Sequence, residues 1–191
     1  MQVYFVASSR LVGKDAKLYG RMYKCIAEGN KMVSNKVWQW LKMGVKDLRN
    51  ESLRVKRENY EYLIKCLKKA EVVVTEVSGH SMSAGYLISQ ALDMNKPVIA
   101  LYKADSKPVF IAGINNRRLF LVEYDENNIE KVLKSAFKKV SGLVDVRFNF
   151  FVSPKILNYL DWIGQKRMIP KSVFLRNLIE REMKKDHEFK G

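Results

Sequence analysis

Two short polar segments carry side chains that could bind an anion. One reads ASSRLVGKD (residues 7–15) and the other reads SGHSMSAG (residues 78–85), and each follows an apolar run. Hydroxyl groups and backbone N–H groups at the start of a helix can donate hydrogen bonds to phosphate oxygens, and Arg10 adds a planar, forked donor. The same serines would also serve as ordinary helix N-caps, so the pattern alone leaves both interpretations open.

Other residue types that carry chemistry are scarce. The chain has two histidines, His80 and His187, which is too few for a His-based metal site or a catalytic triad. Cys25 and Cys66 show no CxxC spacing and indicate free thiols in a reducing compartment. The chain shows no signal-peptide pattern and no apolar run near the roughly 18 to 20 residues of a membrane span. We therefore expect a cytoplasmic protein that uses no metal, no cofactor and no membrane.

The elements that must position the polar segments alternate between strand and helix patterns. Such alternation is typical of an α/β fold, in which helices cover both faces of a parallel sheet. Ligands bind beyond the carboxyl ends of such strands, where both polar segments would lie. Strands are predicted over residues 2–8, 71–77, 96–102 and 118–124, with a further candidate at 31–35, and helices over 15–29, 51–70, 81–94 and 127–140, while 36–50 is ambiguous.

The quoted segments and their surroundings resemble a known family. VYFVASSR, KDAKLYGRM, AEVVVTEVSGHSMSAGYLISQAL and KPVIALY together resemble the nucleoside 2-deoxyribosyltransferase family, and in particular its 2'-deoxynucleoside 5'-phosphate N-hydrolase branch. The resemblance covers residues 1 to about 140. It implies a flavodoxin-like sheet, a dimer, and a nucleoside monophosphate in the crevice. The residues that it assigns to nucleotide binding are Ser8, Ser9, Arg10, Ser81, Gly85 and Tyr86.

The chain departs from this family at the position that matters most for catalysis. The resemblance places the nucleophilic glutamate directly after the Gly-Tyr pair, where this chain has Leu87. A second acidic residue of the family corresponds to Leu63, with Glu61 two positions away. Cleavage of an N-glycosidic bond needs a carboxylate near the sugar, and leucine cannot supply it. We therefore assign no catalytic residue, with Glu76 and Glu61 as the carboxylates that could substitute.

The C-terminal residues form a separate pattern after a linker at 141–145, which places the nucleotide-binding domain at 1–140 and a second domain at 146–191. VRFNFFV alternates between apolar and other residues as a strand does, and two amphipathic helices follow. The first has Ser153 as its N-cap and Pro154 at its first helical position. One strand and two helices cannot bury their apolar faces alone. A second copy of the chain, paired through the strands, would cover these faces.

This segment resembles a ribbon-helix-helix module of the Arc and MetJ type. The resemblance implies that a paired ribbon enters the major groove of DNA. Arginine suits guanine and asparagine suits adenine, whereas a phenylalanine could contact a thymine methyl group. The start of the second helix would bind phosphate. The residues assigned to DNA contact are Arg147, Asn149, Phe151, Lys171 and Ser172. A dimerisation module that never contacts DNA is the alternative.

The charge of the whole chain favours an anionic partner. The formal net charge is +15 and the isoelectric point is near 9.8, which points to nucleic acid ahead of an anionic membrane surface. A basic surface without a specific partner remains the alternative.

These observations lead to one main expectation and two alternatives. We expect a transcriptional regulator that binds double-stranded DNA as a homodimer or higher even oligomer, with a catalytically inactive core that senses a nucleotide-like ligand. The first alternative is an active nucleoside 2-deoxyribosyltransferase or deoxynucleoside monophosphate N-glycosidase with a C-terminal dimerisation tail. The second alternative is a regulator that binds a protein partner. Leu87 favours the main expectation.

Overall fold

The computed structural model describes residues 1–44, 51–79, 81–142 and 150–188. The chain forms two compact units, Met1–Asp145 and Val146–Gly191. Within the described ranges, no helix has both the length and the apolar character needed to cross a membrane.

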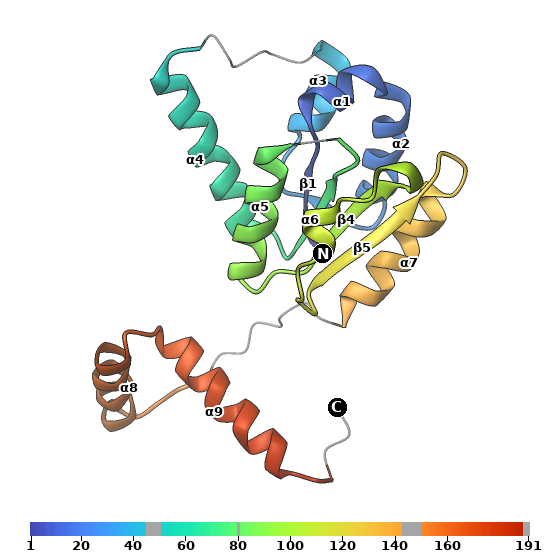
Figure 1. The fold of residues 1–191 in the computed structure, drawn as a ribbon. Helices are drawn as coiled ribbons and strands as arrows, with labels where there is room; N and C mark the ends of the chain where they lie inside the picture. The colour runs from blue at the N-terminus through green and yellow to red at the C-terminus, as the bar shows by residue number, and fades with distance from the viewer. Residues whose placement is uncertain (45–50, 80, 143–149, 189–191) are drawn as a thin grey trace. The chain divides into compact units, whose positions relative to one another are not determined.

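A parallel sheet forms the centre of the N-terminal unit (Figure 1). Its strands are Gln2–Val6 (β1), Lys31–Met32 (β2), Val72–Glu76 (β3), Val98–Lys103 (β4) and Leu119–Tyr124 (β5). They lie in the order β2-β1-β3-β4-β5, and every neighbouring pair is parallel. The register aligns Phe5 with Val74, Val74 with Ile99, and Ile99 with Phe120. The predicted α/β fold with a parallel sheet is confirmed.

Helices cover both faces of this sheet, as predicted. One face packs against α1 (Ser9–Lys14), α2 (Ala16–Ala27), α3 (Lys36–Met43) and α7 (Ile129–Ser141). The other face packs against α4 (Leu53–Lys69) and α5 (Met82–Asp93). Figure 1 shows α4 and α5 on one side of the sheet and α2 and α7 on the other. Two short elements, a 3-10 turn at Ala104–Ser106 and α6 at Val109–Ala112, follow β4.

Strand β3 contributes side chains to the apolar layers on both faces of the sheet. All five of its residues are buried. Val72 and Val74 belong to the layer with α2 and α7, whereas Val73 belongs to the layer with α4 and α5. Because alternate side chains of a strand point to opposite faces, a strand covered on both sides is mostly apolar. This requirement accounts for the unbroken run of valines.

Two segments differ from the sequence-based prediction. Residues Ser9–Lys14 form helix α1, where a loop was expected. The Val12 N–H donates to the Ser8 carbonyl at 3.0 Å, and the buried Val12 side chain holds this turn against the core. The ambiguous segment 36–50 forms α3 over Lys36–Met43, and residues 45–50 lie outside the described part of the chain.

The C-terminal unit contains two helices, α8 (Pro154–Arg167) and α9 (Lys171–Lys185). The Ser153 hydroxyl caps α8 by accepting a hydrogen bond from the Ile156 N–H, and Met168, with a left-handed backbone (φ 53°), ends that helix. The strand predicted at 146–152 lies partly outside the described residues. Its described part, 150–152, is irregular, and a strand needs a neighbouring strand to supply its hydrogen bonds.

Candidate functional site

The two polar segments identified in the sequence lie at the point where the strand order reverses. β1 has β2 on one side and β3 on the other, so the chain leaves β1 and β3 toward different halves of the sheet. Ser8 follows β1 after Ala7, and Ser9 and Arg10 lie in the first turn of α1, with side chains outside the described part of the structure. Ser81 follows β3 and precedes α5. Folds of this kind bind ligands beyond the carboxyl ends of such adjacent strands, and we call this region the crevice.

Ser81 and Gly85 shape one wall of this crevice. The Ser81 side chain caps α5 by accepting a hydrogen bond from the Ala84 N–H at 3.2 Å. Gly85 lies one helical turn further, and a methyl group added there would meet no atom within 4 Å. Both residues are half-buried. The backbone at Gly85 therefore borders open space, and the positive end of the helix dipole at the start of α5 favours an anion.

Tyr86 extends this wall and joins α5 to α4. Its hydroxyl lies 2.9 Å from that of Tyr60 on α4, and the two ring centroids are 6.3 Å apart with a 42° tilt. Both side chains remain about half exposed. The hydrogen bond with Tyr60 is the main cause that raises the pKa of Tyr86, so this phenol stays neutral at physiological pH.

Glu76, at the carboxyl end of β3, is the buried centre of a network that the sequence analysis missed. Its Oε2 accepts a hydrogen bond from the Tyr19 hydroxyl at 2.8 Å. Its Oε1 accepts bonds from the Tyr124 hydroxyl at 3.1 Å and the Ser78 N–H at 3.0 Å. Glu76 is 1% exposed. The network ties α2, β3 and β5 together beneath the crevice.

Burial explains the protonation of the two phenols. Loss of solvent, followed by the negative charge of Glu76, raises the pKa of Tyr19. The same two causes, in the same order, raise the pKa of Tyr124. Both hydroxyls therefore keep their protons and donate to the carboxylate. Helical spacing could have revealed Tyr19, because it shares a buried face with Met22 and Ile26.

The carboxylates and the leucine discussed above occupy different environments. Leu87 is buried among the apolar side chains between α5 and the sheet. Glu61 is exposed on α4. Leu63 is partly buried against the same core as Leu87. His80 lies outside the described residues. Of the two substitute carboxylates, only Glu76 is built into the carboxyl edge of the sheet.

Thr75, beside Glu76, carries a buried hydroxyl. Its Oγ1 finds no hydrogen-bond partner within the described part of the chain. Leaving such a group unsatisfied costs about 1–3 kcal/mol. In the same described part, no three His, Cys, Asp or Glu side chains are placed to hold a metal ion.

A second cluster holds the outer helices in place. The Ser34 hydroxyl, after β2, lies 2.8 Å from the Tyr62 hydroxyl of α4. The Lys36 ammonium bonds to Asn59 and lies over the rings of Trp40 and Tyr62. Burial lowers the pKa of Lys36. These contacts fix α4 against the segment that follows β2.

Of the five residues predicted to contact DNA, the structure describes three. Arg147 and Asn149 lie outside the described residues. Phe151 is fully exposed. Lys171 forms an ion pair with Asp161 of α8, and Ser172 is exposed in the first turn of α9.

Known proteins resemble the N-terminal unit in sequence and in fold. No family model matches the chain. A 5-hydroxymethyl-dUMP N-hydrolase of Tetraodon nigroviridis is 30% identical over 144 residues, which cover 72% of this chain and 97% of that protein. A protein of Nematostella vectensis with the name "Putative 2'-deoxynucleoside 5'-phosphate N-hydrolase 1" is 27% identical over 143 residues, which cover 71% of this chain and 93% of that protein. The solved structure of a CMP N-glycosidase of Clostridium botulinum aligns with a TM-score of 0.50 over 71% of this chain and 99% of that chain. At 12% identity, this last likeness concerns the fold alone.

These relatives contradict the DNA-binding transcriptional regulator expected from the sequence. They are named as enzymes that hydrolyse nucleotides at the N-glycosidic bond, and the similarity extends along nearly the whole length of the two named hydrolases. The alternative interpretation, an N-glycosidase, is therefore the better supported one. The expectation was wrong because it gave more weight to one residue, Leu87, and to the short C-terminal segment than to the large domain that precedes them.

Proposed function

Because the chain belongs to the 2'-deoxynucleoside 5'-phosphate N-hydrolase family, we propose that its N-terminal unit hydrolyses the N-glycosidic bond of a nucleoside 5'-monophosphate. The observation that carries the proposal is the 30% identity with such a hydrolase over 144 residues, together with the Ser81 cap and the unobstructed Gly85 at the start of α5. Water would add to the sugar carbon C1′, and the base would leave with a proton. The products are the free base and the sugar 5-phosphate.

The phosphate of the substrate would bind between the two helix starts. Ser8, just before α1, and Ser9 and Arg10 in its first turn would contact the phosphate. Ser81, the N-cap of α5, would contact it together with the backbone of the first turn of that helix. Phosphate at a helix N-terminus gains from unpaired N–H groups and from the helix dipole.

The charge that the reaction needs would come from Glu76. As the bond to the base breaks, positive charge builds on the sugar ring, and a nearby carboxylate lowers its energy. We propose that Leu87 stands where the family has its nucleophilic glutamate, so no bond to the enzyme forms there and water attacks directly. Glu76, held by three hydrogen bonds, would act through its charge across the crevice rather than as a nucleophile.

A base-release assay tests this function. The full chain is incubated with dUMP, 5-hydroxymethyl-dUMP, dCMP and CMP, and the free base and the sugar phosphate are measured by chromatography. We expect equal amounts of both products from at least one deoxynucleotide, and loss of the activity in Glu76→Gln. A nucleotide that stabilises the protein against heat without any release of base would mean that the unit binds nucleotides and does not hydrolyse them.

We also propose that the C-terminal unit is a dimerisation tail. Its buried core consists of Leu160, Ile163 and Phe174 alone within the described residues. Seven large apolar side chains on the same two helices stay exposed, namely Ile156, Leu157, Tyr159, Trp162, Leu178, Ile179 and Met183. A unit this small cannot bury enough surface to be stable by itself, and association is the usual remedy.

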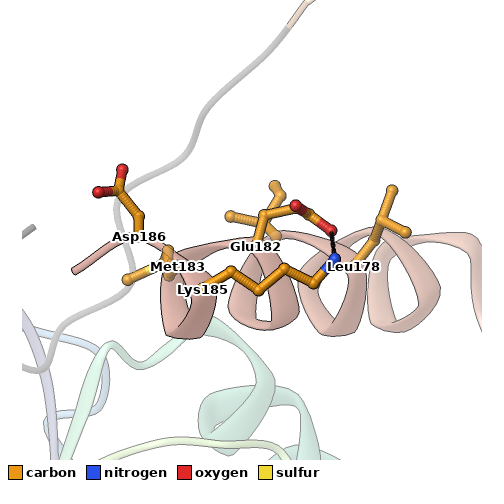
Figure 2. Close-up of a pocket in the computed structure, with 6 residues that line it drawn as sticks. Leu178, Glu182, Met183, Lys185 and Asp186 are labelled. Carbon is orange, nitrogen blue, oxygen red and sulfur yellow. Dashed lines mark hydrogen bonds and ion pairs between the residues drawn. The ribbon is translucent and has the colours of Figure 1, made fainter.

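A hollow along α9 marks the face that a partner would cover. It has a volume of about 520 Å³ and is lined by Leu178, Ile179, Glu182, Met183, Lys185 and Asp186 (Figure 2). The lining contains apolar side chains and side chains of both charges, and Lys185 pairs with Glu182 at 2.7 Å. A second copy presents the same mixture, so a two-fold interface would be self-complementary. Pairing through strands at 146–152, as in ribbon-helix-helix modules, stays a prediction, because 146–149 lie outside the described residues.

A further inference from the structure

Two exposed tyrosines meet between α4 and α5. Tyr60 and Tyr86 are 49% and 45% exposed, yet their hydroxyls form a hydrogen bond of 2.9 Å between α4 and α5. Exposed aromatic rings that are fixed in position by a mutual hydrogen bond offer flat apolar surface at little cost in conformational entropy.

The position of this pair relative to Ser81 suits a nucleotide. α4 precedes β3 and α5 follows it, so the start of each helix lies near the carboxyl end of that strand. Tyr86 lies five residues beyond Ser81, a rise of about 7.5 Å along the helix. Gly85, between them in sequence, borders open space. A ligand whose phosphate is held at Ser81 would therefore run past Gly85 toward the two rings.

We propose that Tyr60 and Tyr86 form the surface that binds the nucleobase of the substrate. This inference rests on the proposed function, because it takes the phosphate to bind at Ser81, and it adds which residues recognise the base. Stacking on an aromatic ring holds any base, since every base has a π-face. The two rings are tilted by 42°, so one base can stack on one ring while its edge approaches the hydroxyl of the other.

The hydroxyl pair can also contact the base edge. In a hydrogen bond between two hydroxyls, the accepting oxygen keeps its own hydrogen atom free to donate. The donating oxygen keeps lone pairs that accept. The pair therefore presents one donor and at least one acceptor, which matches the mixed edge of a pyrimidine.

Contacts on the other side of α4 keep Tyr60 in place. Tyr62, two residues further along the helix, bonds to Ser34 at 2.8 Å, and Lys36 bonds to Asn59. A base that stacks on Tyr60 thus meets a surface already ordered in the free protein, which reduces the entropy lost on binding.

Binding of two probes to the full chain tests the inference. The probes are dUMP and 2-deoxyribose 5-phosphate, which lacks the base, and binding is measured by calorimetry before appreciable base is released. We expect Tyr60→Ala to weaken dUMP binding about tenfold and to leave 2-deoxyribose 5-phosphate binding unchanged. Tyr60→Phe keeps the ring and should weaken dUMP binding by less than about threefold. Phe110→Ala, which removes an exposed ring of α6, should change neither.

The outcomes separate this inference from the proposed function. Equal loss of both probes in Tyr60→Ala, or no loss of dUMP binding, would overturn the base-binding surface while base release could still be observed. Tyr60-dependent dUMP binding without any release of base would overturn the hydrolase and keep the surface. Failure of both probes to bind the wild-type chain would overturn both.

Discussion

Leu87 is apolar and Glu76 is a carboxylate, and the two side chains lie on opposite faces of the sheet. Leu87 packs in the apolar layer of α4 and α5, whereas Glu76 bonds to Tyr19 and Tyr124 in the opposite layer. A carboxylate on the α5 side would lie where the family resemblance puts the nucleophile, and a carboxylate in the opposite layer can act only through its field. The rate of base release should therefore depend on which face of the sheet carries the carboxylate.

Restoring an acid at position 87 tests this idea. Leu87→Glu should raise the rate of base release from dUMP well above that of the wild-type chain, because it adds a nucleophile next to the sugar. Leu87→Gln has the same size without the charge and serves as the control, since either change places a polar group in a buried position. Equal rates for the two variants in a chromatographic assay would show that position 87 is not beside C1′.

Ser81 has a structural role and a proposed ligand role that can be separated. Ser81→Ala should lower the free energy of unfolding by about 1 kcal/mol, because the cap of α5 is lost. It should also remove the stabilisation by dUMP, which for the wild-type chain is about 2.7 kcal/mol at a hundred times the dissociation constant. Ser52→Ala removes the equivalent cap of α4 and should keep the stabilisation by dUMP in thermal unfolding. An intact dUMP effect in Ser81→Ala would place the phosphate elsewhere.

At the scale of elements, α2 is held to the sheet by one buried polar contact as well as by apolar packing. The Tyr19 hydroxyl reaches the Glu76 carboxylate at the carboxyl end of β3, and the ring packs beside Phe5 of β1. The floor of the crevice therefore depends on the position of a helix that precedes β3 by many residues.

Removal of that hydroxyl measures the strength of the contact. Tyr19→Phe keeps the ring and leaves Glu76 Oε2 without its donor, so we expect a loss of about 1–3 kcal/mol in the free energy of unfolding by urea. Tyr23→Phe removes a hydroxyl of the same helix that bonds to Asn35 at the surface, at 3.2 Å, and should cost clearly less. Equal losses in the two variants would mean that burial of the network contributes little.

At the scale of the whole molecule, the two units differ in the size of their buried apolar cores. The N-terminal unit has two extensive buried layers, whereas the C-terminal unit has three buried apolar side chains within its described residues. A second copy of the chain would cover the exposed apolar side chains of the C-terminal unit.

Light scattering over a series of concentrations tests this association. We expect the full chain to be a dimer or a higher even oligomer at micromolar concentration, and Ile179→Lys to shift it toward smaller species, because a charge would enter the apolar face of α9. Lys184→Ala changes a residue of the same helix outside the lining of the hollow and should leave the mass unchanged. A monomeric wild-type chain would contradict the dimerisation tail.

The sequence by itself determined the elements whose signals are local. The buried runs became β1, β3, β4 and β5, and the serines at 52, 81 and 153 begin helices by capping N–H groups three residues away. Such contacts depend on residues within one turn, so composition and spacing reveal them. The α/β class and the family resemblance followed from these signals.

The tertiary structure alone decided which side chains lie beneath and beside the crevice. Glu76 meets Tyr19 and Tyr124 across 57 and 48 residues, and Tyr60 meets Tyr86 across 26 residues. Local periodicity carries no information on strand order or register, and these two properties bring the side chains together. The sequence therefore indicated the two loops and Leu87. The buried carboxylate network and the tyrosine pair could be identified only from the strand order, in which β3 lies between β1 and β4.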